Sequence, residues 1–280
     1  MDGLVVILGA FSFGLGACIA SFLNVVIWRV PRGESIVSPP SHCPKCNTAI
    51  KWYQNIPILS WLALRGKCAN CKAPISPRYP FVEFLGAVLF LAAFWRYGYF
   101  APLAWVWISL MIVGSFIDFD HRLLPDFVTV GGMVWGVATA LVFWAIGAFT
   151  PYHFHNLPCA QGTFYVSIVQ SICGGALGFA LLWLVRFLGS KAFKREAMGL
   201  GDVFLLGAVG AVSGCTAVVF TLVLSSVYGT IAGLGAIALS KARLGKFVEI
   251  PFGPYICLGS LTWMFRGPEI VDWYTKLFVF

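Results

Sequence analysis

The chain has 280 residues, of which 59% are hydrophobic and only 11% are charged, and its formal net charge is +8. Soluble domains carry roughly 25% charged residues and about 45 to 50% apolar ones, so this composition excludes a soluble globular domain. It also excludes a disordered chain, because disorder requires few apolar residues. We therefore expect an all-α polytopic membrane protein.

Eight apolar segments are candidates for crossing a bilayer, which takes about 17 to 25 apolar residues for each helix. In chain order they are residues 4–28, 81–97, 102–117, 127–149, 164–188, 203–220, 222–239 and 252–265. The first segment is expected to stay in the protein, because Asp2 precedes it and its apolar core is too long for a removed signal peptide. The predicted organisation is a first transmembrane helix at residues 1–28, a polar insert at 29–80 and a transmembrane bundle at 81–280.

The basic residues are distributed unevenly across these predicted spans. Sixteen of the 19 Lys and Arg residues fall on one side of the eight-span arrangement, half of them in the insert. The positive-inside rule assigns that side to the cytoplasm, so we expect both termini to face outward. The net charge is then explained by membrane topology, and no nucleic-acid partner is expected.

The insert contains two CxxC pairs separated by 21 residues, Cys43 with Cys46 and Cys68 with Cys71. Two such turns can supply four thiolates in the tetrahedral arrangement that Zn²⁺ prefers. An insert of this size buries too little apolar surface to fold alone, so a metal would supply much of its stability. We predict a structural zinc site with these four cysteines as ligands.

Two alternatives for the insert stay open. The four cysteines could form two redox disulfides, although a cytoplasmic location keeps thiols reduced. His42 adjoins Cys43 and could replace one cysteine as a ligand, although four cysteines already complete a site.

Two acidic residues lie at the predicted cytoplasmic border of the bundle. Placing an ionised carboxyl group in lipid costs at least about 2.5 kcal/mol, so the presence of an acidic residue at each of these positions requires an explanation. Asp118 interrupts the end of the third predicted span, and Asp202 follows a Gly-Leu-Gly run at the start of the sixth. Two carboxyls that meet can divide the roles of acid and base, and such a pair can hydrolyse a peptide bond with an activated water. We predict Asp118 and Asp202 as catalytic residues.

The neighbouring acidic residues have structural explanations. Asp126 precedes an apolar helix, where an acidic N-cap is stabilising, and Asp120 can pair with Arg122. Asp202 could also cap its helix, a role compatible with catalysis. The two glycines before Asp202 either allow a close backbone approach or serve helix packing.

The ordered motifs of this chain resemble those of the type IV prepilin peptidases, bifunctional leader peptidases and N-methyltransferases of the GxGD type. The residues that carry the resemblance are Ser-Phe-Leu-Asn-Val-Val at 21–26, Asn-Ile-Pro at 55–57, Gly-Lys-Cys at 66–68 with Cys71, Arg-Tyr-Pro at 78–80 with Glu83, Asp118, Leu-Pro-Asp at 124–126, Gly-Leu-Gly-Asp at 199–202, and Pro-Phe-Gly-Pro-Tyr at 251–255. One departure is Ala20, where the family usually has Gly.

The resemblance implies that Asp118 and Asp202 form the catalytic pair and that the four cysteines bind zinc. It implies prepilin or pseudopilin substrates, cut after a Gly at the cytoplasmic border of the bacterial inner membrane, with pilus or type II secretion machinery as partners beside the lipid bilayer. It also implies S-adenosylmethionine as a methyl donor. The residues that hold this cofactor stay unidentified, because the chain has no glycine-rich βαβ fingerprint.

Two rival functions are compatible with the composition. The first is a transporter or channel whose border carboxylates carry protons or cations. Such a protein should carry acidic residues near the bilayer midplane, whereas Asp118 and Asp202 flank the predicted spans. The second is a membrane anchor whose insert serves as a docking platform, which leaves Asp118 without a purpose.

Overall fold

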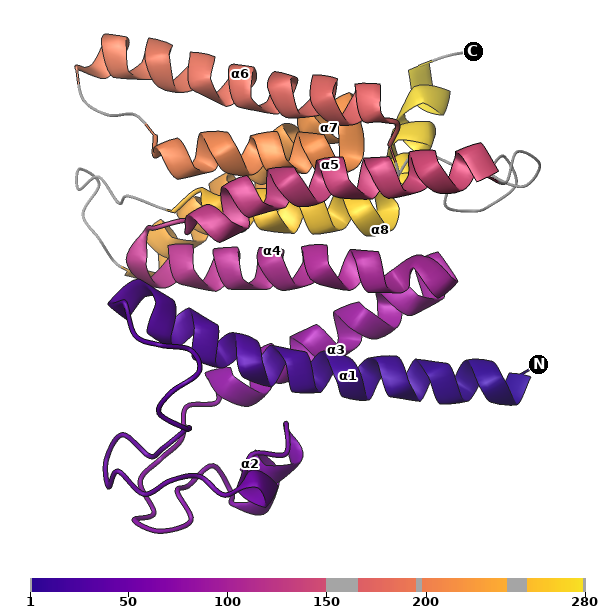
Figure 1. The fold of residues 1–280 in the computed structure, drawn as a ribbon. Helices are drawn as coiled ribbons and strands as arrows, with labels where there is room; N and C mark the ends of the chain where they lie inside the picture. Colours follow the sequence, from indigo (N-terminus) through magenta and orange to yellow (C-terminus); the bar gives the residue numbers. More distant parts are fainter. Residues whose placement is uncertain (1, 150–165, 195–197, 241–250, 279–280) are drawn as a thin grey trace. The chain divides into compact units, whose positions relative to one another are not determined.

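The computed structural model describes residues 2–149, 166–194, 198–240 and 251–278, and all regular elements within them are helices (Figure 1). This confirms the all-α prediction. Large apolar side chains on these helices are exposed, which suits contact with lipid. The chain forms two compact units, Met1–Val113 and Gly114–Phe280. The longer helices are α1 (Asp2–Arg29), α3 (Arg78–Tyr97), α4 (Ala101–His121), α5 (Asp126–Phe149), α6 (Ile168–Phe193), α7 (Leu200–Ser240) and α8 (Gly253–Phe278).

The first unit is built on the packing of α1 against α3. Small residues allow this contact: a Cβ atom added to Gly16 would lie 2.7 Å from the Gly86 carbonyl oxygen, and one added to Gly86 would lie 2.5 Å from the Ala20 Cβ. Ala20, the departure from the family pattern, is therefore accommodated inside the interface. Near the ends of the two helices, Asn24 Nδ2 donates a hydrogen bond to the Tyr79 carbonyl oxygen at 3.2 Å.

The insert between α1 and α3 contains the short helices η1 (Val30–Arg32), η2 (Trp52–Gln54) and α2 (Leu59–Ala63). Its two cysteine pairs sit in two turns of the same design. In each turn, the residue after the second cysteine, Asn47 or Lys72, has a positive φ of 53° or 59°. An antiparallel bridge closes each turn, joining His42 to Ala49 and Lys67 to Pro74. The repeated turn geometry presents both cysteine pairs in the same way.

The insert is connected to α3 by a buried carboxylate. The Ile58 backbone N–H donates a hydrogen bond to Glu83 Oε2 at 2.7 Å, and Glu83 is only 9% exposed. Because a buried acceptor without a partner is costly, this bond fixes where the insert joins the helix.

The second unit is organised around α7, which contacts α5, α6 and α8. Figure 1 shows α6 running alongside the first part of α7. Ser171 Oγ of α6 donates a hydrogen bond to the Ala211 carbonyl oxygen of α7 at 2.7 Å, and Gly174 faces Gly210 with no room for a Cβ atom on either residue. The first half of α7 is therefore the buried centre of this unit.

The predicted count of eight spans is not confirmed. Five stretches of the described residues are long and apolar enough to cross a membrane: Gly3–Arg32, Arg78–His121, Asp126–Ala145, Ile168–Ala192 and Leu200–Ala238. Two of them combine segments that were predicted as separate spans. The 3-10 helix η3 (Gly98–Phe100) joins α3 to α4 without a polar gap, and α7 covers both 203–220 and 222–239.

Two predicted helix boundaries were wrong. The break in α7 lies at Gly214, which has a φ of 82° and a ψ of −179°, and not near residue 221. The reason is conformational, since only glycine adopts this backbone geometry without strain, and the apolar pattern does not change there. The last helix was predicted to end at residue 265, but α8 continues through Pro268 to Phe278. Its second half carries Arg266, Glu269 and Asp272, and α8 is not among the five stretches.

Candidate active site and metal centre

Asp118 lies in the last turn and a half of α4 and is only 6% exposed. The helix ends after it because Arg122 adopts a positive φ of 54° while its N–H still bonds the Asp118 carbonyl oxygen at 2.8 Å, and Pro125 follows. The carboxylate is attracted electrostatically by Arg122. Its Oδ2 atom is buried and has no hydrogen-bond partner of normal geometry among the described atoms. A buried acceptor of this kind is typical of a reactive group that awaits water or substrate.

Asp202 lies in the first turn of α7 and is 8% exposed. Its carboxylate and that of Asp118 repel each other electrostatically, so the two groups are near neighbours although they are far apart in the chain. The buried thiol of Cys257 in α8 also experiences both charges. Groups from α4, α7 and α8 therefore converge, and the structure brings the two predicted catalytic residues together.

Gly253, the first residue of α8, belongs to the same site, and the sequence reasoning gave it no role. A Cβ atom at this position would lie 2.6 Å from Asp118 Oδ2, and the Gly253 backbone amide lies close enough to stabilise the charge of that carboxylate. The signal available in the sequence was a glycine between Phe252 and Pro254 at the start of an apolar run. That pattern indicates a close backbone approach but does not identify its partner.

Leu124 connects the three helices around the carboxylates. A Cβ atom on Gly201 would lie 2.9 Å from the Leu124 Cβ, and one on Gly253 would lie 3.3 Å from its Cδ1. The two glycines let the beginnings of α7 and α8 approach the loop that follows α4. Helix N-termini carry partial positive charge, so this packing places both of them where they stabilise negative charge on Asp118 and Asp202.

The other carboxylates at the predicted border differ from this buried pair in their exposure to solvent. Asp120 and Asp126 are both exposed, and Asp126 is the first residue of α5, which agrees with the helix-start position predicted for it. Exposure lets water solvate these charges, so neither carboxylate resembles the buried pair.

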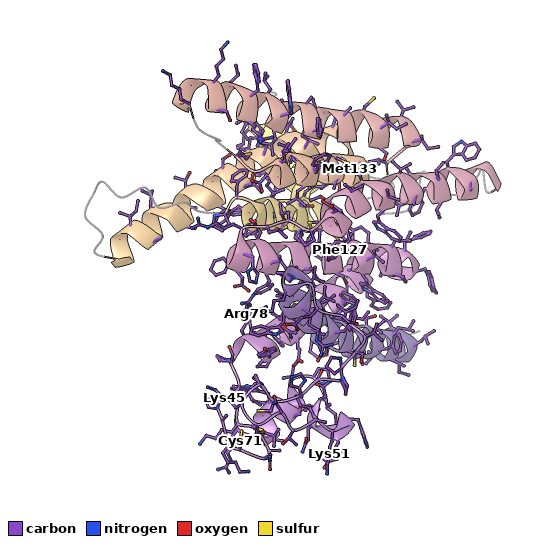
Figure 2. All side chains as sticks on the ribbon, turned by 60° about the vertical axis from the view of Figure 1, so that its left-hand side comes forward. Lys45, Lys51, Cys71, Arg78, Phe127 and Met133 are labelled. Carbon is purple, nitrogen blue, oxygen red and sulfur yellow. The ribbon has the colours of Figure 1, made fainter. Side chains whose placement is uncertain are left out.

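The four cysteines of the insert form a cluster whose geometry fits a tetrahedral metal site. The Sγ atoms of Cys43, Cys46, Cys68 and Cys71 all lie within 4.8 Å of one another, and the Cys43 and Cys71 sulfurs are 3.8 Å apart. Zinc–sulfur bonds of about 2.3 Å in a tetrahedron separate the sulfurs by about 3.8 Å. The cluster therefore matches the predicted ligand set. Figure 2 shows Cys71 in the insert, whose exposed Lys45 and Lys51 side chains project outward.

The thiols have unequal acidities because they share one small volume. Hydrogen bonds with the side chain and backbone of Thr48 lower the pKa of Cys46 to about 6. For Cys71, a backbone hydrogen bond from Ala73 lowers the pKa, but burial and the hydrogen bonds shared with the other three cysteines outweigh it and raise the pKa to about 11. Four adjacent thiolates are thus unfavourable without a cation, and a bound divalent metal would neutralise them.

The alternatives for the insert receive no support from this geometry. The four cysteines are free thiols, and 3.8 Å is far longer than a disulfide bond of about 2.05 Å. His42 is exposed and its Nδ1 contacts the Pro40 carbonyl oxygen at 3.2 Å, outside the cluster.

Family comparisons match most of the chain. Residues 15–97 match the bacterial peptidase A24 N-terminal domain, and residues 105–234 match the type IV leader peptidase family. The first match covers the second half of α1, the cysteine insert and α3, and the second contains both Asp118 and Asp202.

Curated relatives are similar to this chain over nearly its full length. The prepilin leader peptidase/N-methyltransferase of Myxococcus xanthus is 39% identical over 275 residues, which cover 96% of this chain and 76% of the relative. The proteins of the same name from Legionella pneumophila and Aeromonas hydrophila are 36% and 35% identical, and the alignments cover 97% and 96% of this chain and 94% and 93% of the relatives. No solved structure matches the chain.

Proposed function

The chain belongs to the type IV leader peptidase family, and from that premise we propose that it removes the leader peptide of prepilins and methylates the new N-terminus. The observation that carries the peptidase activity is the convergence of the buried Asp118 and Asp202 carboxylates from two different helices. Nothing in the family comparisons favours the transporter or channel alternative.

Asp118 and Asp202 divide the chemistry of hydrolysis between them. The ionised member of the pair accepts a proton from a water as its oxygen attacks the scissile carbonyl carbon, and the protonated member donates a hydrogen bond to the carbonyl oxygen. The tetrahedral intermediate collapses as the C–N bond breaks and the amine leaving group takes up a proton. The buried Oδ2 of Asp118 supports this role, because it has no hydrogen-bond partner of normal geometry among the described atoms and a water or carbonyl group can supply one.

The second activity transfers a methyl group to the amine that cleavage releases. When bound, S-adenosylmethionine would supply this methyl group, which would pass from sulfur to the amine nitrogen as the amine loses a proton. The relatives named N-methyltransferases support this activity.

We propose zinc as the occupant of the cysteine cluster, with all four thiolates as ligands and a structural role. The sulfur separations, the matched turns and the presence of four thiol groups in one cluster support a closed tetrahedral site. Without the metal, the insert has only short helices and few buried residues to hold its shape.

We further propose eight crossings of the bacterial inner membrane, with the insert and the aspartates on the cytoplasmic side and both termini outward. The crossings are α1, α3, α4, α5, α6, the two parts of α7 on either side of Gly214, and α8. The positions of the basic residues support this topology. The natural substrates in this setting are prepilins or pseudopilins of a pilus or type II secretion system, because the cytoplasmic end of their apolar helix reaches the level of the aspartates.

Cleavage of a purified prepilin by aspartate variants tests the peptidase mechanism. We expect Asp118→Asn and Asp202→Asn each to lower kcat by about 10² to 10⁴-fold, because either change removes one partner of the acid–base pair. Asp126→Asn is the matched control, since that exposed carboxylate begins a helix outside the pair. Methylation of an already cleaved pilin shows that the variants are folded. Normal cleavage by either buried-site variant would remove that aspartate from the mechanism.

A further inference from the structure

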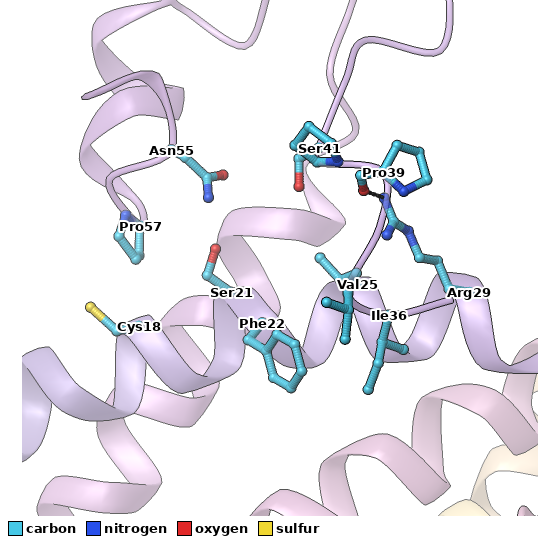
Figure 3. Close-up of a pocket in the computed structure, with 12 residues that line it drawn as sticks. Cys18, Ser21, Phe22, Val25, Arg29, Ile36, Pro39, Ser41, Asn55 and Pro57 are labelled. Atoms are coloured by element: carbon cyan, nitrogen blue, oxygen red, sulfur yellow. Dashed lines mark hydrogen bonds between the residues drawn. The ribbon is translucent and has the colours of Figure 1, made fainter. Parts of the chain in front are cut away.

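A groove of about 390 Å³ lies within the first unit, between one face of α1 and the segment that follows it (Figure 3). Its volume falls within the range of about 300 to 1,000 Å³ that small-molecule and cofactor sites occupy. Ser21, Phe22, Val25 and Arg29 line it from α1, since this spacing places them on one helix face. The groove is separate from the cysteine cluster and contains neither catalytic aspartate.

The Arg29 side chain lines one end of the groove. It is only 8% exposed, and its two terminal nitrogens donate hydrogen bonds to the carbonyl oxygens of Ser35 at 2.8 Å and Pro39 at 2.7 Å. These bonds hold the opposite wall in place. An arginine carries five N–H donors, so donors remain for a ligand. Among the described residues that line the groove, only Arg29 is charged, so its end favours a carboxylate.

Three further polar side chains, Ser21, Ser41 and Asn55, line the groove. The side chains of Ser21, Ser41 and Asn55 make no hydrogen bond among the described residues, and Figure 3 shows Ser21 and Asn55 pointing toward each other across the groove. Hydroxyl and amide groups can both donate and accept, which suits ribose hydroxyls and the edge of a nucleobase. This second polar end is eight residues, or about 12 Å, from Arg29 along α1.

The middle of the groove is apolar. Phe22, Val25 and Ile36 line it between the two polar ends, and Phe22 is half exposed. An aromatic ring attracts a cation such as a sulfonium through its π face. The groove thus suits an elongated ligand with a carboxylate at one end, a polar heterocycle at the other and a soft cationic centre.

We propose that this groove is the S-adenosylmethionine site, with the carboxylate of the cofactor at Arg29 and Ser41, its adenosine at Ser21 and Asn55, and its sulfonium beside Phe22. This inference rests on the methyltransferase part of the proposed function. Because Arg29 is the charged residue among the described groove residues, the product S-adenosylhomocysteine, which has no net charge, should bind at least as tightly as the substrate, whose net charge is positive.

Equilibrium dialysis of radiolabelled S-adenosylmethionine against the zinc-loaded, full-length protein in detergent tests the site. Val25→Trp fills the apolar middle and should raise Kd at least about tenfold, and Asn55→Ala should raise it several-fold. Val6→Trp, the same change at a position of α1 that is 70% exposed, should leave Kd unchanged. Prepilin cleavage by the three variants should stay near the wild-type rate, which shows that they fold.

Photocrosslinking of the wild-type protein gives a readout that does not depend on variants. Ultraviolet irradiation with radiolabelled S-adenosylmethionine, followed by mass spectrometry, should place the adduct on residues 18–41 or 55–57. An adduct elsewhere, or wild-type affinity in Val25→Trp, would overturn the groove assignment and leave the methyltransferase function standing. A wild-type protein that cleaves prepilin but binds no S-adenosylmethionine would overturn the methyltransferase function itself.

Discussion

At the scale of single residues, the site depends on how closely the backbone approaches Asp118. The carboxylate is buried, Gly253 leaves no space for a side chain beside Oδ2, and Leu124 fits against the glycines that begin α7 and α8. Small displacements of a reacting group are costly, since a misplacement of about 1 Å can reduce a rate about 10²-fold. We infer that Gly253 is a positioning residue for the carboxylate and does not itself react.

Gly253→Ala should separate positioning from substrate binding. The new Cβ atom would lie 2.6 Å from Asp118 Oδ2 and must displace the carboxylate. We expect kcat for prepilin cleavage to fall by about 10 to 100-fold with little change in KM. Gly235→Ala is the control, because no atom lies within 4 Å of the Cβ atom it would add. Cleavage by Gly253→Ala at the wild-type kcat would show that the close approach is not needed.

At the scale of elements, two segments have backbone conformations that cannot be predicted from their apolar residues. The helix α7 changes direction at Gly214, and the insert is held by two matched cysteine turns rather than by a core. Each depends on a small number of residues, so each can be tested with one substitution.

Gly214→Ala should destabilise the bundle. A φ of 82° with a ψ of −179° is accessible essentially only to glycine, so an alanine there costs about 1 to 3 kcal/mol of strain. We expect a lower midpoint of thermal unfolding for the purified protein in detergent. Gly235→Ala, a helical position of the same element, should leave that midpoint unchanged or raise it. A Gly214→Ala protein as stable as the wild type would show that the break tolerates a side chain.

Cys43→Ser should remove the metal from the insert. A tetrahedral thiolate site that loses one of four ligands binds zinc far more weakly, and the insert depends on the metal for its stability. Elemental analysis should find about one zinc per wild-type chain and none in the variant, and limited proteolysis should cut the insert faster. Cys173→Ser changes an exposed cysteine of α6 outside the cluster and should keep its zinc. Retention of stoichiometric zinc by Cys43→Ser would refute a four-cysteine site.

At the scale of the whole molecule, the basic residues and the membrane set the orientation. The insert carries half of the 16 cations that the proposed topology assigns to one side, and we expect the segment between α3 and α4 to lie on the other side. Moving several charged residues across a bilayer is costly, so we expect this asymmetry to set the topology as the chain inserts.

Alkaline phosphatase fusions should report this topology, since that enzyme is active only outside the cytoplasm. A fusion after Tyr99, which is 90% exposed in η3, should be active, and one after Lys72 in the insert should be inactive. The reverse pattern would place the cysteine cluster outside and would contradict a cytoplasmic reduced-thiol site.

The local parts of this protein were readable from short patterns. Apolar runs predicted the helices, and the CxxC spacing predicted a cluster whose four sulfurs the structure brings together. Asp118 and Asp202 stood out because an ionised group beside an apolar run needs a compensating reason. Their catalytic role stays a prediction, although the structure places them as neighbours.

Composition, hydrophobic runs and motif spacing by themselves determined the membrane class and the helical fold, predicted the cluster of four cysteines, and singled out Asp118 and Asp202 as candidate catalytic residues. Tertiary structure alone decided that Gly253 and Leu124 adjoin those aspartates, that α7 bends at Gly214 and that a groove forms along α1. The physical reason is the distance along the chain between the residues that interact. The cost of burying charge and the periodicity of helices determine the residue types at neighbouring positions, so both can be recognised in the sequence. Contacts between helices that are distant in the chain depend on side-chain packing, which no local sequence pattern predicts.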